Sequence, residues 1–118
     1  MASRMKRIST HILDVVHGKP AKNVPVRLEK QNAPGGWQLL SSGRTDHDGR
    51  CAQLLPEGEE LSAGVYRLSF DTGSYHAAQS IAALYPVVEV TFQVRDGESH
   101  LHIPLLLSPN GYTTYRGS

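Results

Sequence analysis

The sequence is nearly without cysteine, since Cys51 is the single one among 118 residues. One cysteine cannot form a disulfide within the chain, so the fold must be held together by apolar packing. A chain of this length buries a sizeable core as one domain without such cross-links. A lone thiol also agrees better with a reducing compartment than with the disulfide-rich secreted class.

An excess of charge of one sign is also missing. The formal net charge is +1 and charged residues make up 19% of the chain, so no strong field attracts nucleic acid or an anionic membrane. The densest basic stretch, Arg4-Met5-Lys6-Arg7, is predicted to belong to a flexible leader over residues 1–7. A single domain over residues 8–118 is predicted to follow it. We therefore expect neither nucleic acid nor a membrane as a partner.

Long apolar runs are absent as well. No apolar segment approaches the roughly 20 residues needed to cross a bilayer. The first residues, Met-Ala-Ser-Arg-Met-Lys-Arg-Ile, lack the apolar stretch of a secretory signal. The expected location is the cytoplasm.

Short segments in which apolar and polar residues alternate fill most of the chain, and Gly, Pro and Asn separate them. This pattern is typical of an all-β sandwich or barrel. We predict about eight strands, of which the clearest are residues 8–16, 24–30, 37–40, 51–55, 64–70, 88–94 and 100–107. Residues 74–84 break the pattern, because their alanines favour a helix that Ser74 can cap and Pro86 ends.

The segment His100-Leu101-His102 places two histidines on one face of a predicted strand, because strand side chains alternate. The opposite face is apolar and is predicted to face the core. The histidine face also carries Pro104 and Leu106, an unusual mixture for open solvent. This face is expected to line a cleft or to be covered by another subunit.

Several single residues permit more than one interpretation. His11 lies in the first predicted strand, where a histidine is usually an ordinary polar residue, yet with His100 and His102 it can also form a three-imidazole zinc site. No Asp, Glu or Cys is placed by its spacing as a further ligand or partner. Arg50 leaves the Asp48-Gly49 turn, where an arginine is usually a surface charge. No local sequence marks Ser118 as an activated nucleophile.

Four segments together favour one interpretation: Ser9–Asp14, Thr45–Arg50, His100–Leu106 and Tyr115–Ser118. Their order and spacing resemble those of the 5-hydroxyisourate hydrolases, the enzymatic branch of the transthyretin-like proteins. Gly18-Lys19-Pro20-Ala21 and Val24-Pro25-Val26 also match that family, so the resemblance covers nearly the whole chain. The final tetrapeptide is its most specific element, because the hormone-carrier branch lacks it.

The resemblance implies a β-sandwich of two four-stranded sheets with one short helix, and a homotetramer, a dimer of dimers, with active sites between subunits. It implies a catalytic set of His11, Arg50, His102 and Ser118, with no metal and no cofactor. Tyr115, Arg116 and Gly117 are expected to shape the substrate pocket. The implied reaction is hydrolysis of a ring amide of 5-hydroxyisourate in urate degradation. The alternative is a non-enzymatic carrier that holds a hydrophobic ligand between subunits.

Overall fold

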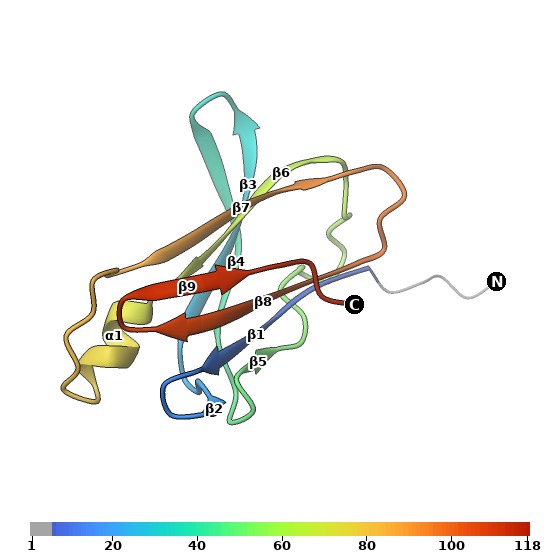
Figure 1. Cartoon of the computed structure of the whole chain (residues 1–118). Coiled ribbons are helices and arrows are strands. Elements are labelled where there is room, and N and C mark those ends of the chain that lie inside the picture. The colour runs from blue at the N-terminus through green and yellow to red at the C-terminus, as the bar shows by residue number, and fades with distance from the viewer. Residues whose placement is uncertain (1–5) are drawn as a thin grey trace.

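The computed structural model describes residues 6–118, which form two β-sheets and one short helix (Figure 1). Residues 1–5 of the predicted leader lie outside the described residues, whereas Arg7, its last residue, begins the first strand. The elements are β1 (Arg7–Asp14), β2 (Lys19–Pro20), β3 (Pro25–Ala33), β4 (Gly36–Arg44), β5 (Arg50–Cys51), β6 (Gly64–Phe70), α1 (Thr72–Ala77), β7 (Val88–Val94), β8 (His100–Ser108) and β9 (Gly111–Thr114).

The two sheets have different strand orders. One sheet has the order β4-β3-β6-β7 and is antiparallel throughout. The other has the order β2-β1-β8-β9, and β5 pairs with β1 as a fifth strand. Within this second sheet only β1 and β8 run parallel, and they bring residues from the two ends of the chain side by side. The predicted β-sandwich with one short helix is confirmed, with five strands rather than four in one sheet.

The core fills the space between the sheets. Alternate residues of β8 are buried, from Leu101 to Leu107, as the sequence pattern predicted. The inner face of the other sheet contributes Tyr66, Leu68 and Phe70, all fully buried. Burying one such side chain stabilises the folded state by about 1.5–3 kcal/mol. The histidine face of β8 therefore points outward, away from this core.

Two predicted strands are longer than expected by two or more residues, and one is shorter by three. Strands β3 and β4 form a hairpin that includes Ser41–Arg44, residues of low strand propensity that pair with the buried half of β3. Strand β5 stops at Cys51, and beyond it the exposed residue Gln53 pairs with β1 through its side chain. The Oε1 atom of Gln53 accepts a hydrogen bond from the Ile8 backbone N–H at 3.2 Å. In a longer β5 strand, a backbone carbonyl would accept this bond. The pattern did not predict β2 or β9.

The helix prediction was wrong in its bounds. The cap is Asp71, whose Oδ1 accepts the Ser74 backbone N–H at 3.1 Å, so α1 begins two residues before Ser74. The helix ends after Ala77, because Ser80 takes a left-handed φ of 59° and the Ile81 N–H returns to the His76 carbonyl at 3.0 Å. Pro86 lies nine residues after Ala77 and so does not end the helix. The residues between them do not continue the helix, although the alanines among them favour it.

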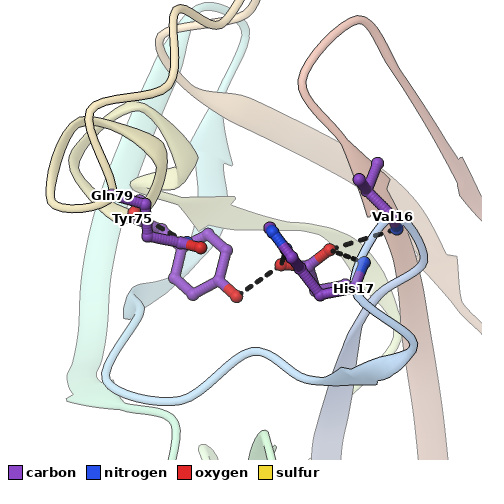
Figure 2. A network of polar contacts seen from close by, with 5 residues as sticks. Val16, His17, Tyr75 and Gln79 are labelled. Atoms are coloured by element: carbon purple, nitrogen blue, oxygen red, sulfur yellow. Dashed lines mark hydrogen bonds and ion pairs between the residues drawn. The ribbon is translucent and has the colours of Figure 1, made fainter.

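A polar junction ties α1 to the turn after β1 (Figure 2). Asp14, 3% exposed, accepts the Tyr75 hydroxyl at 2.7 Å, the His17 ring Nδ1 at 2.8 Å and the backbone N–H groups of Val16 and His17. Burial of this carboxyl opposes its ionisation, but the hydrogen bonds from Tyr75 and His17 outweigh that effect and lower the pKa of Asp14 to about 2. Burial and the bond to Asp14 raise the pKa of Tyr75 to about 12. The ionised carboxylate of Asp14, through its hydrogen bond from Tyr75, therefore holds α1 against the sheet.

Candidate active site

The outer face of the β1–β8 sheet gathers the polar side chains that the sequence singled out. In the ladder, His11 lies opposite Arg50 on β5 and opposite Pro104 on β8, while Ser9 lies opposite His102. Directly opposite residues share a face of the sheet, with Cβ atoms about 5 Å apart. The parallel register of β1 and β8 thus brings together two segments about ninety positions apart in the chain.

A depression of about 200 Å³ lies on this face. Three of the four predicted catalytic residues, Arg50, His102 and Ser118, line it. The remaining lining residues come from β1, the start of β8 and the chain after β5: Arg7, Ser9, Thr10, Ala52 and His100. We call this site the outer-face depression.

The tail segment Tyr115–Ser118 folds back over β8 and so brings Ser118 into the depression (Figure 1). Gly117 forms an isolated bridge with His102, and its N–H donates to the His102 carbonyl at 2.8 Å. A Cβ on Gly117 would lie 2.6 Å from His102 Cδ2 and 3.1 Å from Pro104 Cγ. Only glycine allows the tail to lie this close to the imidazole ring.

An ion pair holds the tail one residue earlier. The Arg116 guanidinium donates to both carboxylate oxygens of Glu98, at 2.9 and 3.1 Å. This bidentate geometry is the more specific form of a charge-assisted pair. The hydrogen bond from Arg116 lowers the pKa of Glu98. The tail is therefore attached at two consecutive residues, once through a side chain and once through the backbone.

Ser9 links the two histidines of β8. Its hydroxyl lies 2.8 Å from His102 Nδ1 and 3.2 Å from His100 Nε2, so it can donate to one ring and accept from the other. This contact fixes the orientation of the His102 ring. It also leaves Nε2 of His102 without a hydrogen-bond partner in residues 6–118, available to a bound molecule.

The environment of His102 favours its neutral form. Burial lowers the pKa of this imidazole below its ordinary value, and the positive charges of Arg50, His100 and His11 lower it further. His102 is therefore neutral near pH 7 and able to accept a proton.

The structure separates the predicted site residues into two groups. Arg50, His102 and Ser118 line the outer-face depression, and Gly117 packs against His102 beside it. His11 does not line it, but is close enough for its charge to act on His102.

Tyr115 and Arg116 lie elsewhere on the tail. Tyr115 is 53% exposed, and Arg116 points to Glu98 instead of into the depression. Neither side chain therefore lines the depression.

Sequence reasoning missed two contributors, Ser9 and Glu98. Ser9 precedes His11 by two positions, which places both on one face of a strand, and that alternation was a usable signal. The contact of Ser9 with His102 depends on the parallel pairing of distant segments, which no local pattern reveals. Glu98 lies in the turn before β8, and no sequence signal distinguishes it from the other acidic residues in turns.

In residues 6–118, no three His, Cys, Asp or Glu side chains are grouped closely enough to hold a metal ion. In the same part of the chain, no helix is both long and apolar enough to traverse a bilayer.

Comparison with known proteins places the chain in a family. A model of the HIUase/Transthyretin family matches residues 8–117. The chain belongs to this family. A curated relative, the 5-hydroxyisourate hydrolase of Salmonella typhi, is 43% identical over 118 residues, covering 100% of this chain and 85% of that protein.

Solved structures of both branches of the HIUase/Transthyretin family resemble the fold. The 5-hydroxyisourate hydrolase of Klebsiella pneumoniae matches with a TM-score of 0.83 and 35% identity, covering 97% of this chain and 100% of that one. Sea bream transthyretin, solved in complex with thyroxine, matches with a TM-score of 0.86 and 38% identity, covering 93% of each chain. Overall similarity of the fold therefore does not separate the two branches, and the site must do so.

Proposed function

We propose that this member of the HIUase/Transthyretin family is a 5-hydroxyisourate hydrolase. The observation that carries the proposal is the convergence of Arg50, His102 and Ser118 on one depression. These residues come from three separate segments of the chain. The curated relatives named 5-hydroxyisourate hydrolase, 37–45% identical over nearly the whole chain, support the same conclusion. The substrate is a small planar purine derivative, and the reaction opens its six-membered ring in urate degradation.

Hydrolysis of a ring amide needs an activated water, and His102 supplies the base. Neutral His102 accepts a proton from water at Nε2, in the tautomer whose Nδ1–H donates to the Ser9 hydroxyl. The hydroxide so formed adds to the amide carbonyl carbon. The imidazolium then returns the proton to the ring nitrogen as the carbon–nitrogen bond breaks, which leaves a carboxylic acid that ionises by releasing its own proton to solvent. General acid–base catalysis of this kind contributes about 10²–10⁴-fold to a rate.

Arg50 stabilises the negative charge that develops on the carbonyl oxygen. Its guanidinium is planar, always charged and rich in donors, which suits a flat substrate with several carbonyl groups. Losing one donor to such an oxyanion typically slows a reaction by about 10²–10³-fold. Arg50 also acts on His102, since its charge lowers the pKa of the imidazole. One residue therefore supports both the base and the oxyanion.

His11 and Ser118 complete the proposed set. His11 lies opposite Arg50 in the ladder and assists in relaying the proton to and from His102. Ser118 positions the substrate or the water through its hydroxyl, and Gly117 sets its place beside the ring of His102. Tyr115 and Arg116 then act on substrate binding by fixing the course of the tail. The resulting product is 2-oxo-4-hydroxy-4-carboxy-5-ureidoimidazoline.

The proposal includes a homotetramer, a dimer of dimers, with sites between subunits. A depression of about 200 Å³ is small for a ligand site, so a second subunit would complete its wall. Exposed apolar side chains, among them Val15, Val16, Leu84 and Tyr112, supply surface for such contacts. Native mass spectrometry tests the assembly.

The proposed location is the cytoplasm, and the proposed reaction uses no metal.

The deciding experiment follows the ultraviolet absorbance of freshly generated 5-hydroxyisourate, with and without the protein. We expect decay well above the spontaneous rate, saturating with substrate. Unchanged decay would refute the hydrolase assignment.

The rival function is a carrier, and the thyroxine complex of the sea bream relative gives it a specific basis. A carrier binds iodinated aromatic ligands at a stoichiometric, saturable site and leaves 5-hydroxyisourate unaltered. Isothermal titration with thyroxine, run beside the decay assay, separates the two. The polar lining of the outer-face depression favours hydrolysis over binding of a hydrophobic hormone.

A further inference from the structure

A second cavity, of about 650 Å³, lies beside α1 and shares no lining residue with the outer-face depression. We call it the α1 cavity. Three cationic side chains line it: Lys19 on β2, Lys22 in the segment after it, and Arg44 at the end of β4. Its volume falls within the range of about 300–1,000 Å³ that small-molecule sites occupy.

These three cations have no acidic partner in the part of the chain that the structure describes. Within residues 6–118, none of Lys19, Lys22 and Arg44 forms an ion pair, and the polar contact of Arg44 is a 3.4 Å bond from Nη1 to the Asn23 carbonyl. No Asp or Glu lines the cavity. In a chain whose net charge is +1, this is a local concentration of uncompensated positive charge.

Nearby acids are engaged elsewhere. Asp48 lies next to His47, a further lining residue, with its Oδ2 3.6 Å from His47 Nε2. Asp71 receives the N–H and the hydroxyl of Ser74 as the cap of α1. Asp14 lies behind Tyr75, 3% exposed, and directs its oxygens at the polar junction.

The walls of the α1 cavity are held by specific contacts. Tyr75 forms one wall, and its hydroxyl is fixed by Asp14 (Figure 2). Below the cations, the Thr45 hydroxyl donates to the Ala21 carbonyl at 2.8 Å and accepts the Val24 N–H at 2.9 Å. These bonds join the segment that carries Lys22 to the strand end that carries Arg44. The backbone segments that carry Lys22 and Arg44 are therefore joined by buried hydrogen bonds.

We propose that the α1 cavity binds a small organic anion that carries two or more negative charges on an apolar or planar body. Lysine and arginine pair with phosphate and carboxylate groups, and Arg44 can do so through two parallel hydrogen bonds. The ring of Tyr75 and the rings of Pro20 and Pro25 offer apolar contact to the body of the ligand. This site is separate from the proposed hydrolase chemistry and does not depend on it.

Isothermal titration at low ionic strength tests the proposal with three probes: ADP, citrate and neutral adenosine. We expect saturable binding of at least one anion, and at least tenfold weaker binding of adenosine. If ADP binds and citrate does not, the cavity requires a phosphate group attached to a planar body. If citrate binds as well, negative charge is the requirement that the two ligands share. No saturable binding of either anion would overturn the proposal, as would equal binding of adenosine.

Matched charge reversals locate the site. Arg44→Glu should weaken anion binding at least tenfold, whereas Arg95→Glu should change it less than twofold. Arg95 follows the far end of β7, a strand of seven residues spanning about 23 Å, and interactions over that distance are largely screened in salt. Equal weakening by both substitutions would show non-specific attraction and overturn the proposal. Lys22→Gln, a neutralising change at an exposed position, gives the same test should Arg44→Glu fail to fold.

Discussion

Replacing Gly117 by alanine tests how closely the tail must approach His102. The added Cβ would lie 2.6 Å from His102 Cδ2 and 3.1 Å from Pro104 Cγ. Carbon atoms in contact prefer a separation of about 3.5–4.0 Å, so the tail and the imidazole must move apart by about 1 Å. Pro104 is buried in the sheet and cannot yield, which leaves the tail to move.

Two effects of different size follow from this displacement. Moving the tail lengthens the 2.8 Å bond from the Gly117 N–H to the His102 carbonyl. One such bond contributes about 1 kcal/mol, which corresponds to a fall in the thermal midpoint of about 4 °C for a domain of this size. A catalytic group displaced by about 1 Å can slow turnover by about 10²-fold. Gly117→Ala should therefore damage activity far more than stability.

The assay compares kcat/KM for 5-hydroxyisourate decay with the thermal midpoint of the same preparation. Gly111→Ala is the matched control, because its added Cβ would meet nothing closer than Ser108 Oγ at 3.8 Å. We expect the control to stay within twofold of the wild-type rate. A Gly117→Ala protein with near wild-type kcat/KM would refute the close packing of the tail against His102.

Four further predictions concern charge, protonation and metal dependence. Glu98→Gln should lower kcat/KM several-fold by freeing Arg116 and the tail, and steady-state kinetics would show no loss if the ion pair were incidental. The acid limb of the kcat/KM profile should lie below the ordinary histidine pKa, because burial and neighbouring positive charge lower that of His102. In His100→Gln this limb should move to higher pH, and an unmoved limb would contradict the assignment of the base. Asp14 has a pKa of about 2 in the folded protein against an unfolded value of 3.8, so it contributes about 2 kcal/mol that is complete above about pH 5 and lost as the pH falls towards 2. Asp14→Asn should remove that acid-dependent part of the thermal midpoint, and an identical pH dependence in both proteins would argue against the junction. Dialysis against EDTA should leave the hydrolysis rate unchanged, and a loss restored by zinc would revive a metal-dependent mechanism.

The faces of the strands could be predicted from the sequence because alternation is a local property. The apolar residues of β8 and the outward direction of His100 and His102 followed from a two-residue period. The strand from Gly64 to Phe70 and the one from Val88 to Val94 were predicted with their observed bounds. The end of α1 was not, because the left-handed turn at Ser80 overrides the helix propensity of Ala82 and Ala83.

The candidate site was harder to predict because it depends on contacts between distant segments. His11, Arg50, His102 and Ser118 were named through resemblance to a family, and nothing in the local sequence indicated that three of them would meet. The hydrogen bond of Ser9 to His102 and the ion pair of Glu98 with Arg116 arise from strand pairing and from the path of the tail. Such contacts become visible only once the sheets are assembled.

The most direct test of the account measures the initial rate of 5-hydroxyisourate decay with three proteins side by side: the wild type, His102→Gln and His47→Gln. His47 lies outside the outer-face depression, so its variant controls for the loss of a histidine as such. The account predicts rapid decay with the wild type and His47→Gln, and a rate at least 10²-fold lower with His102→Gln. A His102→Gln protein that hydrolyses the substrate as fast as the wild type would contradict it.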